Sequence, residues 1–126
     1  MMARSWLQFV PRKIPVVGVR IGTSRHKALV DTGAAISMVA PEVALKLGMA
    51  STWTYPIVGI SGQRQTPRTV QLPGVGFGNV ELQPRRAAVV DLAPLGLSVE
   101  IILGVNALYK HRLQFDFIEG RIYIMG

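Results

Sequence analysis

Short stretches in which apolar and polar residues alternate, separated by Gly and Pro, make up most of this chain. In the first of them Val17, Val19 and Ile21 alternate with a glycine and an arginine, which is the period of a strand with one buried face. A polar turn at 23–25 then leads into a second apolar strand over 26–30. This pattern predicts an all-β fold.

The same signals predict further strands at 77–83, 86–90 and 98–104, and a closing hairpin with strands at 113–117 and 121–124. The segment 52–72 has two polar, β-capable arms on either side of a glycine-bounded tip, which predicts an exposed hairpin. Two short helices complete the prediction. One begins at Pro41, which suits the first turn of a helix, and ends at Gly48, and the other covers 105–110.

The chain of 126 residues is long enough for one domain with a substantial core. We expect that domain to span 1–126, with a peripheral N-terminal strand within 1–13. Hydrophobic residues make up 49% of the chain and the mean hydropathy is +0.33, which excludes a disordered protein.

Three features of the composition bear on location. No apolar run approaches the roughly 20 residues that cross a bilayer. Residues 1–10 lack the long apolar stretch of a secretory signal. The chain has no cysteine, which excludes disulfides and thiolate chemistry and is typical of a reducing compartment. We therefore expect no membrane span and a cytoplasmic protein.

The net charge is +7, from 14 Lys and Arg against 7 Asp and Glu. A basic balance can indicate contact with nucleic acid or a membrane surface. Here the basic residues are scattered, and no run of Lys and Arg exceeds two. This distribution favours solubility and a preference for acidic partners over a dedicated nucleic-acid site.

The tripeptide Asp31-Thr32-Gly33 directly follows the apolar strand at 26–30. A charged carboxylate is costly to bury, so an aspartate there needs hydrogen-bond donors or a functional reason. On three residues alone, an ordinary turn in which the aspartate binds its own backbone is the better interpretation. The apolar flanks instead favour the loop of an aspartic peptidase, where a carboxylate shares a proton with a second one and activates water.

Four segments resemble, in the same order, the retroviral-type (retropepsin-like) aspartic proteases, and above all their small cellular and bacterial members. They are the strand and loop at 28–34, the flap-like 58–62, the strand and helix start at 101–108, and the hairpin at 115–124. The first and third segments are specific as a pair, because family members close the active-site floor with both. The resemblance implies a closed, β-barrel-like domain with a flap hairpin and one or two short helices.

Only one Asp-Thr/Ser-Gly triplet exists, because Asp91 is followed by Leu-Ala and Asp116 by Phe-Ile. A mechanism with two carboxylates therefore requires a homodimer in which both copies of Asp31 face each other across a twofold axis. Like charges about 3 Å apart cannot both ionise, so the pair holds one proton. The ionised member acts as general base on water and the protonated one polarises the scissile carbonyl, with no need for a metal or cofactor.

The resemblance assigns the other roles in binding an extended peptide or protein substrate. It implies that Thr32 forms a hydrogen bond across the dimer and that Gly33 directs its N–H toward the carboxylates. The remaining substrate-binding residues that it implies are Ala34 and Ala35 after the motif, Ile60, Ser61 and Gly62 in the flap, and Ile102 and Leu103 beneath it. Apolar pockets of this kind imply cleavage between apolar residues.

Two positions depart from the retroviral pattern. Retroviral enzymes usually have an aspartate two residues after the motif glycine and an arginine after the later glycine, and the two interact. Here these positions are Ala35 and Val105. Loss of both partners together avoids a buried unpaired charge. It implies different substrate and dimer contacts.

Several other residues invite functional interpretations that the sequence does not favour. His26 and His111 lie between basic residues, so we expect solvated surface histidines and no metal site. We expect Trp6 and Trp53 to pack in the core or at a sheet edge. The glycines at 74–78 lack the helix and the Lys-Ser/Thr of a phosphate loop.

The preferred function is thus a homodimeric aspartic endopeptidase. The alternative is a catalytically weak module that uses a protease fold for peptide or protein binding, or for dimerisation. The interface strands stay open at this point. The strand at 122–124 can pair across the twofold axis or fold back onto 115–117 in its own chain, and 6–10 is a third candidate.

Overall fold

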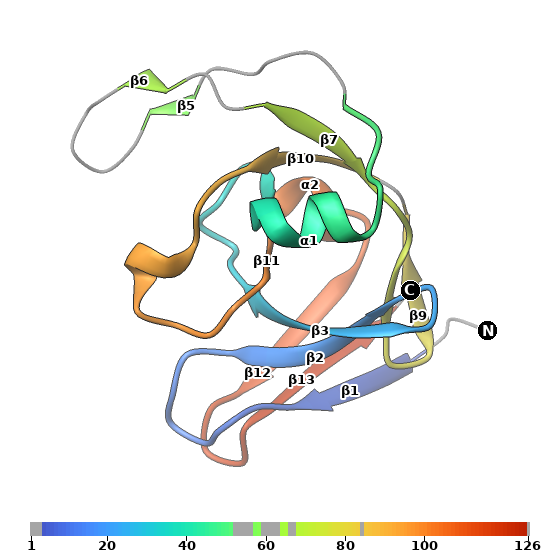
Figure 1. The fold of residues 1–126 in the computed structure, drawn as a ribbon. Coiled ribbons are helices and arrows are strands. Elements are labelled where there is room, and N and C mark those ends of the chain that lie inside the picture. The colour runs from blue at the N-terminus through green and yellow to red at the C-terminus, as the bar shows by residue number, and fades with distance from the viewer. Residues whose placement is uncertain (1–3, 52–56, 59–63, 66–67, 84, 126) are drawn as a thin grey trace.

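The structure is a computed structural model that describes residues 4–51, 57–58, 64–65, 68–83 and 85–125. Its largest sheet contains eight strands in the order β7-β10-β4-β11-β3-β2-β8-β9. Their bounds are β2 (Val16–Ile21), β3 (Ser24–Val30), β4 (Ser37–Val39), β7 (Thr69–Leu72), β8 (Val75–Phe77), β9 (Val80–Leu82), β10 (Arg85–Val89) and β11 (Ile101–Leu103). The sheet curls from β7 and β10 around to β2 and β3 (Figure 1), which confirms the all-β, barrel-like prediction.

A second sheet contains three strands in the order β1-β13-β12. They are β1 (Arg4–Gln8), β12 (Arg112–Asp116) and β13 (Arg121–Met125). Strand β13 pairs with β12 on one edge and with β1 on the other, both antiparallel. The C-terminal strand therefore folds back within its own chain, and neither of its edges is left for a strand of a second copy.

The short strands β5 (Ile57–Val58) and β6 (Arg64–Gln65) pair antiparallel, as the two arms of a hairpin do. The tip between them, with Ile60, Ser61 and Gly62, lies outside the described residues.

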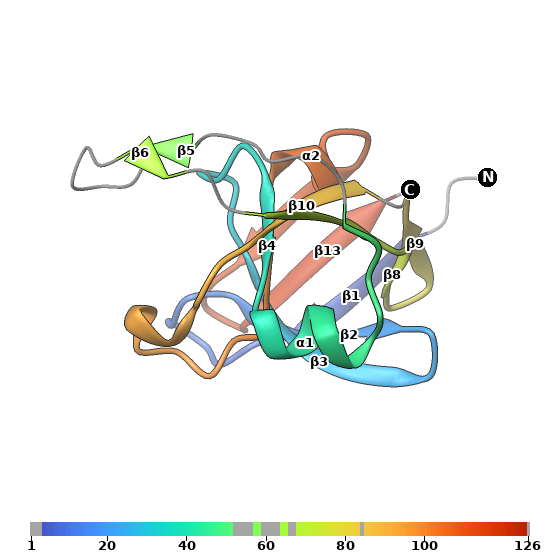
Figure 2. The ribbon, with the colours of Figure 1, turned by 45° about the horizontal axis from the view of Figure 1, so that its top comes forward.

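The helices lie where the sequence predicts them. Helix α1 (Pro41–Lys46) has proline in its first turn, and Gly48 follows it with φ of 60°. Helix α2 (Val105–Leu108) begins directly after β11. A single 3₁₀ turn, η1 (Ala93–Leu95), precedes β11. Figure 2 shows α1 on one side of the large sheet and α2 near the end of β10. None of the described helices is long and apolar enough to cross a membrane.

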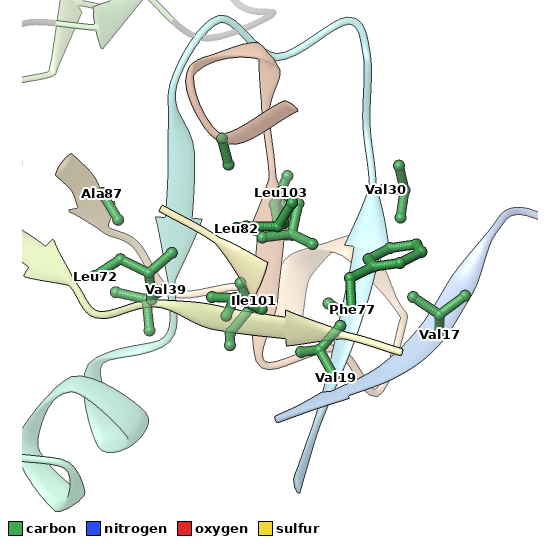
Figure 3. Close-up of a cluster of buried hydrophobic side chains, with 14 of the residues drawn as sticks. Val17, Val19, Val30, Val39, Leu72, Phe77, Leu82, Ala87, Ile101 and Leu103 are labelled. Atoms are coloured by element: carbon green, nitrogen blue, oxygen red, sulfur yellow. The ribbon is translucent and has the colours of Figure 1, made fainter. Parts of the chain in front are cut away.

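The core fills the inside of the curled sheet (Figure 3). Its fully buried large side chains come from both halves of the sheet and include Val17, Val39, Leu72, Phe77, Leu82, Ile101 and Leu103. Strands on either side of the core alternate buried and exposed residues, as β2 and β3 do. The three residues of β11 are all buried, because this strand lies in the centre of the sheet between β3 and β4.

Two predicted strands differ from the observed ones. The single strand predicted at 77–83 is a hairpin of β8 and β9 that turns at Gly78, where φ is 60°. A Cβ at Gly78 would also collide with the Ser5 side chain of β1, so glycine is required there. The strand predicted at 98–104 begins only at Ile101.

Candidate active site

The loop after β3 is fixed by backbone hydrogen bonds. The N–H of Asp31 donates to the carbonyl of Leu103 at 3.0 Å, which extends the parallel pairing of β3 with β11 by one residue. The carbonyl of Asp31 accepts from the N–H of Ala34 at 3.2 Å, which closes a tight turn. The end of β3 next to this loop is marked by Val30 in Figure 3, with Leu103 on the neighbouring strand. The position of Asp31 is therefore set by the central strands of the sheet.

The Asp31 carboxylate is half-buried, while Thr32 and Gly33 are exposed. The N–H of Gly33 donates to Asp31 Oδ1 at 2.9 Å. A Cβ on Gly33 would lie 3.2 Å from the same oxygen, which is tighter than an ordinary contact. An ordinary turn and a peptidase loop share this bond. The carboxylate is only half-buried, so it is accessible from outside the chain.

The second motif packs directly against this loop. The N–H groups of Val105 and Asn106 donate to the carbonyls of Ala34 and Ala35, at 2.7 and 3.2 Å. A Cβ on Gly104 would lie 2.7–2.8 Å from backbone atoms of the loop, so no larger residue fits without displacing it. The start of α2 thus forms the floor on which the Asp31 loop rests.

A side-chain network ties the loop and its floor together. Asn106 Oδ1 accepts from the Ser37 N–H at 2.8 Å and from the Ser37 hydroxyl at 2.7 Å. The Ser37 oxygen in turn accepts from the N–H of Gly104 at 3.0 Å. Asn106 Nδ2 donates to the carbonyl of Arg86 at 2.7 Å. Ser37 and Asn106 carry no role in the prediction from sequence, although both are polar residues within otherwise apolar motifs.

A cavity of about 330 Å³ opens beside Asp31. It is lined by Pro15, Val30, Asp31, Thr32, Phe115 and Phe117. The rings of Phe115 and Phe117 are stacked, with centroids 6.0 Å apart and planes 12° from parallel. Sequence reasoning missed these aromatic residues because they come from the closing hairpin, more than 80 residues after Asp31.

The other residues predicted to bind substrate lie in different environments. Ala34 is half-buried and Ala35 is exposed. The side chain of Leu103 is fully buried in the core, and that of Ile102 is almost so. Leu103 therefore contributes its backbone carbonyl to the loop, and its side chain presents no surface. Val105, at the position of the retroviral arginine, is exposed.

The prediction for His26 is wrong. This histidine is 6% exposed, because it points to the inner face of β3 together with Ala28 and Val30. Its Nδ1 lies 2.8 Å from Glu100 Oε2, and its Nε2 lies 2.7 Å from the Ser24 hydroxyl. Glu100 is 74 positions away in the chain, so neighbouring residues gave no sign of it.

Glu100 has an altered acidity. Partial burial by itself would raise the pKa of its carboxyl. The hydrogen bonds from His26 and from the Lys27 N–H, together with the charges of His26 and Lys46, outweigh that effect and lower the pKa.

His111 and Trp6 lie in different environments. His111 is half-buried, and its Nδ1 has no hydrogen-bond partner among the described residues. Trp6 lies on the outer strand β1 with the Arg121 guanidinium 4.6 Å from its ring centroid, a cation–π contact at a sheet edge. Trp53 lies outside the described residues. Within the described part of the chain, no three His, Asp or Glu side chains gather as a metal site would require.

Sequence comparison defines the class of protein. A family model described as aspartyl protease matches residues 17–107, so the chain belongs to the aspartyl protease family. The match includes the Asp31 loop and its floor up to the start of α2. No curated protein matches the chain in sequence.

Two solved structures share the fold. A retropepsin-like aspartic protease from Rickettsia conorii is 17% identical with a TM-score of 0.69, over 99% of this chain and 92% of the other. The retroviral protease-like domain of Ddi1 from Leishmania major is 20% identical with a TM-score of 0.54, over 82% of this chain and 79% of the other. The fold is therefore retropepsin-like, as the sequence resemblance predicts.

Proposed function

We propose that this protein is an aspartic endopeptidase that acts as a homodimer, with Asp31 of each chain forming the catalytic pair. The observation that carries the proposal is the Asp31 loop itself. Its backbone is fixed by β11 and by the start of α2, while its carboxylate stays open to the outside of the chain. Since the sequence holds a single Asp-Thr-Gly triplet, a second copy has to supply the second carboxylate.

The chemistry follows from two carboxyl groups in contact. Only one of them ionises at mildly acidic pH, because two like charges at about 3 Å repel strongly. The ionised Asp31 takes a proton from a water molecule as the water attacks the scissile carbonyl. The protonated Asp31 of the other chain donates a hydrogen bond to the carbonyl oxygen. Proton transfer to the leaving nitrogen then releases both products, and Gly33 N–H holds the carboxylate in place throughout.

We propose an extended polypeptide as the substrate. The cavity beside Asp31 is walled by Pro15, Phe115 and Phe117, and this apolar lining favours an apolar side chain next to the cleaved bond. The backbone at Ala34 and Ala35 is the further contact on this side, and the buried side chains of Ile102 and Leu103 support the site from beneath. Ile60, Ser61 and Gly62 keep their predicted role of covering the peptide from above, and Thr32 keeps its predicted role of bracing the two loops.

The second candidate is a module of the same fold that binds peptides or dimerises with little turnover. The observation that favours it is the replacement of the interacting charges of retroviral enzymes by Ala35 and Val105, both exposed here. The two candidates share the fold and the dimer, and they differ only in whether Asp31 performs chemistry. The absence of nucleic-acid binding and a cytoplasmic location remain predictions for either candidate.

The test is cleavage of an unfolded protein substrate across pH by the wild-type protein and by Asp31→Asn. We expect activity to be greatest in mildly acidic solution and to fall by about 1,000-fold or more in the variant, since loss of a catalytic group typically has effects of this size. Asp91→Asn is the matched control. It removes the same charge from an exposed loop outside the proposed site, so its activity is expected to equal that of the wild type.

Cleavage that persists in Asp31→Asn, after contaminating proteases have been excluded, contradicts the proposal. Inactivity of a wild-type protein shown to be dimeric favours the binding module instead. Inhibition by pepstatin would add support for the enzyme class.

A further inference from the structure

The hairpin of β2 and β3 carries three basic side chains on its outer side. Both strands alternate buried and exposed residues, and Arg20, Arg25 and Lys27 are exposed on the same side, where they form a basic face. Arg20 lies directly opposite Arg25 in the antiparallel pairing, and Lys27 is two residues further along β3. Like charges directly opposite each other destabilise a sheet. The arrangement therefore needs a reason other than the stability of the fold.

No carboxylate neutralises the basic face within the described part of the chain. The N–H of Glu100 donates to the carbonyl of Lys27, so the two residues are neighbours, but the Glu100 carboxylate pairs with His26 at 2.8 Å. Glu81 lies on β9, two strands from β2, and its Oε1 lies 2.6 Å from the point where a Cβ on Gly74 would be. The charge of the basic face is therefore left for a partner from outside the chain.

Glycines on neighbouring strands make room for both arginine side chains. A Cβ on Gly76 would lie 2.6 Å from Arg20 Nη2 and 3.0 Å from its Cζ. The same Nη2 donates to the carbonyl of Gly78 at 2.6 Å. A Cβ on Gly18 would meet Arg25 Nη1 at 3.7 Å. Both guanidinium groups thus lie close to the sheet, and a side chain that is already held in place loses less conformational freedom when it binds an anion.

From these observations we propose that the basic face binds an acidic polypeptide segment in extended conformation. Arg25 and Lys27 are two residues apart on one strand, so their side chains lie about 6.6 Å apart, which is also the spacing of alternate residues in an extended peptide. Acidic residues at every second position of the segment therefore meet both cations, and Arg20 on β2 adds a third. The net charge of +7 attracts such a segment over a longer range.

A polypeptide fits this face better than a nucleic acid does. Proteins that bind single-stranded nucleic acid combine cations with aromatic side chains on which the bases stack. The residues that share the outer side of the hairpin include no aromatic one: they are Val16, Gly18, Arg20, Arg25, Lys27 and Leu29. The face thus offers charge without a stacking surface.

The basic face is separate from the candidate active site. None of its three cations lines the cavity beside Asp31. In Figure 1 the turn between β2 and β3 lies beside β9, at the end of the hairpin away from the strand end that leads to Asp31. The proposal rests on the proposed function in taking a protease substrate as the carrier of the acidic segment. A substrate held here reaches the active site at a higher effective concentration, which lowers KM and leaves kcat unchanged.

The test is the binding of two labelled peptides, measured by fluorescence anisotropy with the Asp31→Asn protein so that the peptides are not cleaved. One peptide has Glu at every second position with Thr between, and the other has Gln in place of each Glu. We expect the Glu peptide to bind at least about tenfold more tightly at low salt, and its affinity to fall as salt is added.

Arg25→Glu in the same protein separates recognition from stability. It is expected to weaken binding of the Glu peptide by about tenfold or more. It also places opposite charges across the strands, since Arg20 lies opposite, so the urea midpoint is expected to stay or rise. Lys13→Glu is the matched control. It makes the same change in net charge in an exposed loop before β2, and we expect binding within about threefold of that of the unchanged protein.

Equal binding of the two peptides, or a Lys13→Glu variant as weak as Arg25→Glu, would overturn the proposed face. A single-stranded oligonucleotide that binds more tightly than the Glu peptide and is lost in Arg25→Glu would overturn the choice of a polypeptide. In an active wild-type protein, an acidic extension of the substrate that leaves KM unchanged would overturn its role in substrate binding. Anisotropy does not depend on activity, so peptide binding with the expected variant effects but no Asp31-dependent cleavage would refute only the proposed function.

Discussion

Each end of β11 is tied by side-chain hydrogen bonds to a neighbouring strand, through Ser37 of β4 at one end and His26 of β3 at the other, but the two ends use different chemistry. Next to the Asp31 loop, Ser37 and Asn106 form a network of neutral groups. At the opposite end, His26 and Glu100 form a pair that includes titratable groups. An endopeptidase whose carboxylates share a proton works in acid, where neutral hydrogen bonds keep their strength. The end that positions Asp31, the proposed catalytic group, is thus the end held by groups that do not titrate in acid.

The largest effect is expected from a substitution that disrupts the floor beneath the Asp31 loop. Gly104→Ala inserts a Cβ within 2.8 Å of backbone atoms of Ala34 and Ile36, which cannot move without displacing the loop. We expect the free energy of unfolding to fall by about 3 kcal/mol and cleavage to be lost. Urea unfolding measures the first effect and peptide cleavage the second. Gly18→Ala is the control, because its Cβ would meet its nearest neighbour at an ordinary 3.7 Å. Equal losses in the two variants would show that the floor is not specially tight.

The next largest effect is expected from a substitution that removes the hydrogen-bond network of Ser37 and Asn106 and leaves the backbone in place. Asn106→Ala leaves the Ser37 N–H and hydroxyl without their acceptor in a buried site, which we expect to lower the free energy of unfolding by about 2 kcal/mol. Because the network is neutral, the loss should be the same at pH 7 and pH 4. Urea unfolding at both values measures it. Asn79→Ala, at an exposed turn, is the control. A loss that changes strongly with pH would contradict the contrast between the two ends.

The smallest effect is expected at the end of β11 where His26 pairs with Glu100, called the charged end below. The pKa of Glu100 is lower in the folded protein than its ordinary value of 4.5, so the folded state binds fewer protons than the unfolded state. The stability that this carboxylate adds is present above pH 4.5 and is lost as pH falls through the folded pKa. The Glu100 side chain is 38% exposed, so we expect less than about 1 kcal/mol.

Glu100→Gln removes this titration and should flatten the dependence of the urea midpoint on pH below 4.5. Glu81→Gln, at an exposed position, should leave that dependence as it is in the wild type. If Glu100→Gln and the wild type lose stability in parallel on acidification, the charged end contributes nothing to the acid response.

The contrast between local and distant signals also explains what the sequence could predict. The Asp31 loop, the glycine of the floor and both helices could be predicted because their cues lie within a few residues of one another. The partners of His26 and the aromatic wall of the cavity could not, because Glu100, Phe115 and Phe117 come from distant parts of the chain. The prediction of one strand at 77–83, where the structure has the hairpin of β8 and β9, is a different case. Gly78 and Asn79 lie between two apolar strands and are a local signal for a two-residue hairpin turn, so this turn could have been predicted from the sequence.

Because β13 is enclosed by two strands of its own chain, each subunit completes its small sheet before it meets another. Subunits of the proposed homodimer can therefore separate and exchange without unfolding. In a mixed population with Asp31→Asn, active pairs would then decline as the square of the intact fraction. A minority of inactive subunits would inactivate a larger fraction of the dimers than their own fraction of the chains. Dilution would dissociate the remaining active dimers.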